Sequence, residues 1–310
     1  MCVGNCVRKV PRMAKRGSRV NDAVTNWAFT AGWSVSKRLP ERAARKAFQS
    51  GADLLWSRNA GGVERLTSNL ARVKPELSQK ELGQLSKEGM RSYMRYWCEA
   101  FRLPTLTPSG ISNGFELRGV ELLDQAMADG TGAIMIPGHM ANWDIAGAWA
   151  AQRYGSVTTV AEQLKPKDLF DQFLAFRESL GMEVLPLGES DVMRTLARRL
   201  RAGRLVALLG DRDMTKGGVE VEFFGATASM PAGPATLAVI TGAPLHPVTM
   251  HYEDDKAVGV VYPRVEVPDF EDRGEQIKHM TQQIAQAFEI GITKHPEDWH
   301  MLQRVWINES

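Results

Sequence analysis

The apolar positions of the chain follow two different patterns, one in each part of the sequence. Up to about residue 104, apolar residues recur every three to four positions, as they do in amphipathic helices. This spacing predicts helices over residues 21–39, 41–58 and 78–102. The last of these begins with Ser78 and Glu81 at the spacing of a capping box. The first third of the chain is therefore expected to be helical.

After residue 104, short apolar runs alternate with helical patterns. The runs expected to be strands cover residues 115–119, 133–137, 157–161, 182–187, 205–209 and 219–224. Strands separated by helices of 10–15 residues indicate βαβ units and a parallel sheet. Residues 245–252 and 258–262 are expected to pair as an antiparallel hairpin, and residues 276–293 to form a closing helix.

These patterns predict an α/β fold in which a central, mostly parallel sheet is flanked by helices. We expect a basic arm at residues 1–20 and one domain at residues 21–310. Within that domain, residues 21–104 form a helical N-terminal cover and residues 105–310 form the α/β core.

Composition excludes several classes of protein. The 310 residues are 44% hydrophobic and 24% charged, which is ordinary for a globular protein. A formal net charge of only +2 argues against a nucleic-acid partner for the whole protein. No apolar run approaches the roughly 18–20 residues of a membrane-spanning helix. The N-terminus also lacks the apolar segment of a signal peptide, so we expect a soluble or peripheral protein.

The N-terminus nevertheless has features of a membrane-binding segment. Residues 1–20 carry six Lys and Arg side chains and no acid, which suits an anionic lipid surface or a solvated tail. The helix at residues 21–39 contains Trp27 and Trp33, which fit either a membrane interface or the protein core. Three cysteines provide no disulfide framework and no metal-ligand spacing, which fits a reducing, cytosolic compartment.

The most informative segment follows the expected strand at residues 133–137. His139 comes directly after Pro137 and Gly138, and Asp144 lies where the next helix begins. Sites in open α/β sheets form at the carboxyl ends of strands. Two residues five apart do not share a helix face. His139 and Asp144 can therefore meet only if the histidine lies in the turn and the acid in the first helical turn.

In that arrangement the carboxylate would bond one ring nitrogen and leave the other as a general base for an alcohol. A purely structural hydrogen bond remains the alternative. A Gly-x-Ser-x-Gly elbow, a Walker loop and a complete Gly-x-Gly-x-x-Gly fingerprint are all missing from the sequence. A covalent acyl-enzyme, nucleotide hydrolysis and dinucleotide binding therefore have little support.

Several ordered blocks resemble a known family. The pair His139 and Asp144, followed by residues 176–181 and 210–213, is similar to the bacterial lipid A biosynthesis (lauroyl/myristoyl) acyltransferases. Residues 220–225, 230–234 and 295–303 resemble the actinobacterial branch of that family, which acylates phosphatidylinositol mannosides. The likeness covers roughly residues 20–306.

The resemblance implies transfer of a palmitoyl-type chain from acyl-coenzyme A to the 6-hydroxyl of a mannose on a phosphatidylinositol mannoside. Acyl-coenzyme A would be a co-substrate, and no cofactor or metal is implied. The protein would lie on the cytoplasmic face of the cell membrane, held peripherally by its N-terminal helices. His139 would be the general base and Asp144 its orienting partner.

The resemblance also implies an acceptor-binding set. Glu162 and Arg177 fall in blocks that line the acceptor side in this family, and an Arg and a Glu near a strand end would pair there. The alternative for Arg177 is a surface charge on a helix.

The block at residues 210–213 offers further polar groups. Asp211 and Asp213 could bond sugar hydroxyls while Arg212 meets phosphate. Alternatively, one of these acids is a second carboxylate on His139, or the block is a capped turn with solvated charges. Glu220 is a second-tier candidate for contact with the histidine, since its strand neighbours face the other side.

Other functions remain open from the sequence. The acceptor could be a different glycolipid, or the donor an acyl carrier protein. A metal-dependent hydrolase could use His139, Asp144, Asp211 and Asp213 as ligands. A non-catalytic membrane-binding protein is the third possibility.

Overall fold

The computed structural model describes residues 36–60, 62–163, 167–215 and 217–307. The expected basic arm and nearly all of the helix expected at residues 21–39 lie outside these residues.

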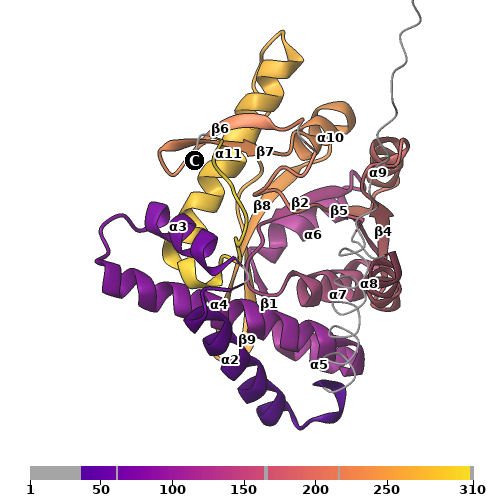
Figure 1. Ribbon diagram of the computed structural model, residues 1–310. Coiled ribbons are helices and arrows are strands. Elements are labelled where there is room, and N and C mark those ends of the chain that lie inside the picture. The colour runs from indigo at the N-terminus through magenta and orange to yellow at the C-terminus, as the bar shows by residue number, and fades with distance from the viewer. Residues whose placement is uncertain (1–35, 61, 164–166, 216, 308–310) are drawn as a thin grey trace, which may run out of the picture.

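Three helices lie beside the sheet as an N-terminal cover (Figure 1). They are α2 (Glu41–Ser57), α3 (Val63–Val73) and α4 (Gln79–Arg102). The capping box of α4 is present, because Ser78 accepts from the Glu81 N–H and the Glu81 carboxylate accepts from the Ser78 N–H. Apolar side chains of these helices, among them Leu66, Leu70 and Met90, pack into a cluster of their own.

Seven strands form the central sheet in the order β1-β9-β8-β2-β5-β3-β4. Their bounds are β1 (Phe115–Arg118), β2 (Ala133–Pro137), β3 (Val157–Ala161), β4 (Met182–Pro186), β5 (Leu205–Ala207), β8 (Leu245–Glu253) and β9 (Lys256–Val261). Neighbouring strands are parallel except β8 and β9, which form the expected antiparallel hairpin. The predicted α/β class with a mostly parallel sheet is confirmed.

Helices cover both faces of this sheet. Helix α7 connects β2 to β3 and α8 connects β3 to β4, so the chain advances towards the β4 edge of the sheet. Helix α9 then connects β4 to β5, and α10 precedes β8, so the chain returns in the opposite direction. Because parallel crossovers are right-handed, this reversal places the second pair on the opposite face. Figure 1 shows the sheet passing between the two pairs. The remaining bounds are α5 (Pro108–Gly114), α6 (Val120–Ala128), α7 (Trp143–Tyr154), α8 (Lys167–Ser179), α9 (Val192–Arg201), α10 (Gly233–Thr241) and α11 (Arg273–Lys294).

Some elements differ from the prediction. The strand expected at residues 219–224 exists as β6 (Val219–Phe223), but it pairs with β7 (Ala226–Met230) in a separate two-stranded sheet. The apolar pattern does not predict β7, α3 or α5. Among the helices that the structure describes, none has the length and apolarity needed to cross a membrane.

Candidate active site

His139 lies in a short turn between β2 and α7. Ala141 has a φ of 43°, a left-handed conformation that is uncommon for a residue with a side chain. This turn places Asn142 at the N-cap of α7, where its side chain accepts from the Ile145 N–H. The imidazole is one-fifth exposed, with a side-chain exposure of 19%. The ring is therefore fixed at a strand end and still open to a substrate.

Asp211 holds the imidazole. Its Oδ1 lies 2.6 Å from Nδ1 of His139, and its Oδ2 accepts from the backbone N–H of His139 at 2.8 Å. Strand register explains the meeting, because β2 and β5 pair in parallel with the same offset of 72 residues that separates His139 from Asp211. Gly210 allows the two chains to approach, since a Cβ there would lie 2.2 Å from Cγ2 of Ile136.

The electrostatics favour an ionised Asp211. Complete burial alone would raise the pKa of Asp211, but the charge and hydrogen bonds of His139 hold that pKa below its usual value. Trp299 adds a third donor, since its Nε1–H bonds Oδ2 of Asp211 at 3.0 Å. A carboxylate on Nδ1 keeps the proton there and leaves Nε2 as the basic nitrogen.

The C-terminal segment closes the back of this turn. The Ala141 N–H donates to the carbonyl of Asp298, and the His300 N–H donates to the carbonyl of His139. Met140 and Trp299 form an isolated β-bridge between the same two segments. The position of His139 therefore depends on residues 298–300 as well as on β2.

Asp144 has other partners than the one expected. Its Oδ1 accepts from Nε of Arg177 at 2.7 Å, and its Oδ2 accepts from the hydroxyl of Tyr96 at 2.8 Å. The prediction that Asp144 orients the ring of His139 is therefore wrong, because Asp211 occupies that place. The alternative that an acid of residues 211–213 is the carboxylate on His139 is confirmed for Asp211.

Arg177 is likewise not a surface charge. The expected pairing of Arg177 with Glu162 is wrong, because Asp144 is the acid that Arg177 bonds. Burial alone would lower the pKa of Arg177, but the charge of Asp144 holds it above the usual value. Burial, followed by the charge of Asp144, raises the pKa of Tyr96 well above its usual value. Asp144 and Tyr96 are buried, whereas the side chain of Arg177 is 19% exposed and lines the groove. The charges of Asp144 and Arg177 compensate each other.

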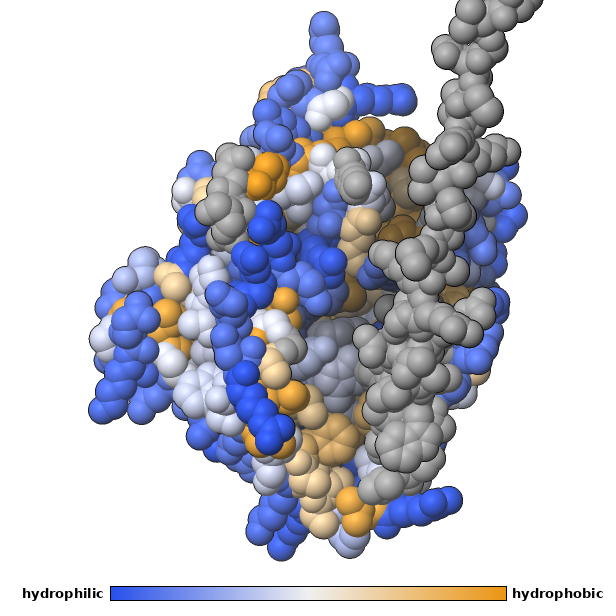
Figure 2. Space-filling view, in the orientation of Figure 1, coloured by the Kyte–Doolittle hydropathy of each residue, from blue (hydrophilic) through white to orange (hydrophobic). Residues whose placement is uncertain are grey.

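A groove of about 570 Å³ contains His139. Its walls come from α4, α8, α9 and the segments after β2, β5 and β7, and most of them are apolar. Figure 2 shows one face of the molecule, on which apolar and hydrophilic side chains lie next to one another in the middle as well as towards the edges. A groove of this size and character is typical of a site for a ligand with a long apolar part.

Most of the predicted binding residues line this groove. They are Glu162, Arg177, Arg212 and Asp213. Asp213 accepts hydrogen bonds from the N–H groups of Thr215 and Gly218, so it also caps its own loop. Glu220 is exposed on β6 and is not among the described residues that line the groove. The structure therefore does not bring Glu220 to the histidine.

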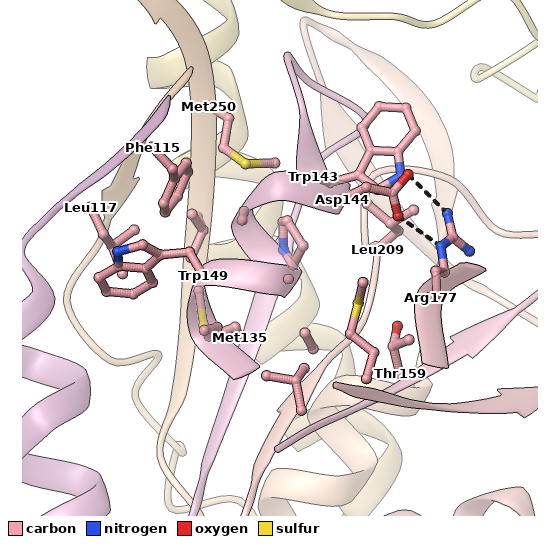
Figure 3. Close-up of a pocket in the computed structure, with 18 of the residues that line it drawn as sticks. Phe115, Leu117, Met135, Trp143, Asp144, Trp149, Thr159, Arg177, Leu209 and Met250 are labelled. Carbon is pink, nitrogen blue, oxygen red and sulfur yellow. Dashed lines mark hydrogen bonds and ion pairs between the residues drawn. The ribbon is translucent and has the colours of Figure 1, made fainter. Parts of the chain in front are cut away.

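A smaller cavity of about 70 Å³ lies behind the groove, between α7 and the sheet. Figure 3 shows the Asp144–Arg177 pair beside Trp143 at one end, with Phe115, Leu117 and Trp149 at the other. Trp143 and Arg177 line both the groove and this cavity. The ion pair thus belongs to the wall that the two spaces share.

The sequence did not assign roles to two residues that complete the site. Trp299 bonds Asp211, and the ring of His300 lines the groove, where its Nε2 lies 2.8 Å from Oγ of Ser92. Both fall in residues 295–303, which were recognised only as a block of family likeness. The signal in the sequence is the adjacent pair Trp299 and His300, two aromatic side chains in an otherwise polar block.

A metal site has limited support among the described residues. His295, Glu297 and Asp298 are the group whose ligand atoms lie within 4.8 Å of one another. Both carboxylate oxygens of Asp298 already accept hydrogen bonds, one from Ser92 and one from the Tyr252 N–H. Asp144, one of the four ligands considered from sequence, bonds Arg177 and Tyr96.

Comparison with known proteins identifies the family of the chain. The model of the bacterial lipid A biosynthesis acyltransferase family matches residues 13–308. The chain belongs to this family. The resemblance drawn from the sequence blocks is confirmed, and the protein is a member of an acyltransferase family rather than of a hydrolase or non-catalytic family.

Two relatives are similar to this chain over nearly its whole length. A phosphatidylinositol mannoside acyltransferase of Mycobacterium tuberculosis (strain ATCC 25618 / H37Rv) is 43% identical over 294 residues, which are 94% of this chain and 91% of the relative. A phosphatidylinositol mannoside acyltransferase of Mycolicibacterium smegmatis is 41% identical over 286 residues, which are 92% of each chain.

Proposed function

We propose that the protein transfers a long, palmitoyl-type acyl chain from acyl-coenzyme A to the 6-hydroxyl of a mannose on a phosphatidylinositol mannoside. The observation that carries this proposal is the imidazole of His139, bonded by Asp211 and open to an apolar groove of about 570 Å³. The names of the two relatives support the class of acceptor.

The reaction follows from the position of the ring. Nε2 of His139 takes the proton as the O–H bond of the mannose breaks, and the oxygen bonds the thioester carbonyl carbon. The tetrahedral intermediate then loses its C–S bond, and the imidazolium returns the proton to the coenzyme A sulfur. General-base assistance of this kind is worth roughly 10²–10⁴-fold in rate.

The polar groups of the groove suit the acceptor. Glu162 and Asp213 offer carboxylate oxygens to sugar hydroxyls. Arg212 has no ion-pair partner among the described side chains, whereas Arg177 is compensated by Asp144. Arg212 is therefore the cation we assign to the phosphodiester of the lipid.

Membrane attachment is the second part of the proposal. We place the protein peripherally on the cytoplasmic face, with the basic residues 1–20 and the tryptophans of residues 21–39 on the lipid. Deleting residues 1–39 is expected to weaken binding to anionic vesicles while a water-soluble acceptor is still acylated. Unchanged vesicle binding would contradict this attachment.

One assay tests the reaction. The purified protein is incubated with labelled palmitoyl-coenzyme A or palmitoyl-acyl carrier protein and a panel of mannosylated inositol lipids and other glycolipids. We expect mass spectrometry to detect a monoacylated mannose from the coenzyme A donor with the wild type, and none with a folded His139→Ala variant. Turnover by His139→Ala at the wild-type rate would refute the catalytic role of His139.

A further inference from the structure

The side chain of Trp299 is fully buried, with 0% of its surface exposed. Its Nε1–H donates to Oδ2 of Asp211 at 3.0 Å, and that same oxygen accepts from the backbone N–H of His139. The other oxygen of Asp211 lies on the ring nitrogen Nδ1. Trp299 and His139 therefore hold the two oxygens of one carboxylate, which fixes the rotation of the carboxyl group about its bond to Cβ.

Trp299 also contacts the turn that carries His139. It forms a β-bridge with Met140, and its chain neighbours Asp298 and His300 bond the backbone of Ala141 and His139. The same short segment thus positions the acid through a side chain and the histidine through the backbone. Such support from outside the reacting groups keeps a catalytic pair in its productive geometry.

We propose that Trp299 is a positioning residue of the acyl transfer, whose indole N–H holds Asp211 on His139 and limits how strongly Asp211 retains a proton on the ring. This inference rests on the proposed function, since it concerns the same histidine.

The direction of its effect follows from hydrogen bonding. A donor on Oδ2 disperses the negative charge of Asp211 and contributes to the lowered pKa of this acid. Without that donor, Asp211 becomes a stronger acceptor for the Nδ1–H and stabilises the imidazolium. We therefore expect His139 to give up its proton at a higher pH. Because the carboxyl group can then rotate about its bond to Cβ, we also expect the orientation of the ring to be less well defined.

Trp299→Phe replaces none of the other charged groups around His139. Apart from two tyrosines, the titratable groups that share the groove with His139 are Glu162, Arg177, Glu189, Arg212, Asp213 and His300. Of the groups that Trp299 hydrogen-bonds through its side chain, Asp211 is the titratable one that contacts His139.

The chain offers a matched control. Trp306 is also buried, lies 6.3 Å from Trp299 between ring centroids, and donates its Nε1–H to the carbonyl of Phe223. Trp299→Phe and Trp306→Phe each remove one indole N–H and a similar volume from one aromatic cluster. Only Trp299 bonds Asp211.

Two readouts are compared between these variants. The first is the pH dependence of kcat/KM, whose acid limb reports the free enzyme's base. The second is the titration of His139 by nitrogen-15 NMR in the protein without substrate. For Trp299→Phe we expect kcat/KM to fall at least tenfold and both midpoints to rise by about half a pH unit or more. For Trp306→Phe we expect both midpoints to stay at the wild-type value.

Unchanged midpoints in Trp299→Phe, or equal shifts in both variants, would overturn the proposal. If Trp299→Phe does not fold, β-(3-benzothienyl)alanine at position 299 keeps the bicyclic shape without the N–H and must give the same shift. The NMR readout needs no turnover. If the wild type were inactive but the His139 titration still shifted in Trp299→Phe, the proposed reaction would be rejected and the hold of Trp299 on Asp211 and His139 retained.

Discussion

Asp211 is bonded to two different nitrogens of His139, the ring Nδ1 at 2.6 Å and the backbone N–H at 2.8 Å. The acid therefore fixes both the tautomer of the ring and the position of the residue that carries it. An acid attached only to the ring would leave the turn free to move. This double contact makes Asp211, rather than Asp144, the partner on which the proposed base catalysis depends.

Replacing Asp211 by Asn should remove this function while preserving shape. The amide cannot stabilise the imidazolium and competes for the wrong tautomer, so we expect kcat/KM to fall roughly 10²–10⁴-fold. Asp124→Asn is the matched control, because Asp124 lies on α6, is not among the described residues that line the groove, and bonds Arg153. Steady-state kinetics on folded variants measures both, and equal losses would contradict the special role of Asp211.

The strand ends could be predicted from the sequence, but the order of the strands could not. The apolar runs located β2 and β5 and therefore placed His139 and Asp211 at carboxyl ends. Strand β5 lies directly beside β2, although α7 connects β2 to β3. Local periodicity does not show that β5 lies between β2 and β3, because strand order depends on long-range packing. The sequence therefore points to the nearer acid, Asp144, as the partner of His139.

The site residues from helices and from the C-terminus were harder to place for the same reason. Arg177 was expected on the groove and is there, but its partner comes from the first turn of α7 rather than from β3. Trp299 and Asp211 are 88 residues apart in sequence, and their contact depends on the tertiary fold. The family resemblance indicates that residues 295–303 matter, but it does not show which atoms are in contact.

The buried pair of Asp144 and Arg177 should matter first for stability. Breaking a buried ion pair leaves one charge without compensation, which typically costs about 3–5 kcal/mol. Arg177→Met should therefore lower the free energy of unfolding by an amount of this order. The double variant Asp144→Asn/Arg177→Met should lose less than the sum of the two single variants, because no charge is stranded. Urea unfolding of the four proteins measures this, and strictly additive losses would show that the two residues are not coupled.

Glu162 and Glu220 allow a residue of the groove to be compared with one outside it. Glu162 lines the groove, whereas Glu220 is exposed on β6 away from it. Glu162→Gln should raise the KM for the mannosylated acceptor several-fold, since a hydrogen bond to a charged group is worth about 1.5–3 kcal/mol and part of it survives in the amide. The KM for the acyl donor should not change. Glu220→Gln should leave both values within twofold, and an effect as large as that of Glu162→Gln would mean that β6 contacts the substrate.

The hydrogen-bonded series Asp298–Ser92–His300 should make the free energy of unfolding depend on pH. Ser92 bonds both Asp298, at 2.5 Å, and His300, at 2.8 Å. Burial, followed by the charge of His139, lowers the pKa of His300 to about 3, and burial raises the pKa of Asp298 to about 6. Each group therefore prefers its neutral form inside the protein.

The two shifts act in opposite directions between pH 4 and 6. The contribution of His300 to stability is complete above pH 6.5 and is lost as the pH falls towards 3. The contribution of Asp298 is complete below about pH 4 and is lost as the pH rises through 6. In the wild type these slopes largely cancel, and each alone amounts to at most about 1.4 kcal/mol per pH unit.

Replacing one of the two residues should leave only the pH dependence of unfolding that the other contributes. Compared with the wild type, Asp298→Asn should gain stability more steeply from pH 4.5 to 6, because only the contribution of His300 remains. His300→Phe should show the reverse, by about 1–2 kcal/mol over the same interval. Urea unfolding at the two pH values measures the difference, and all other carboxylates contribute equally to the three proteins. Parallel pH profiles would mean that His300 and Asp298 are not held in their neutral forms in the folded protein.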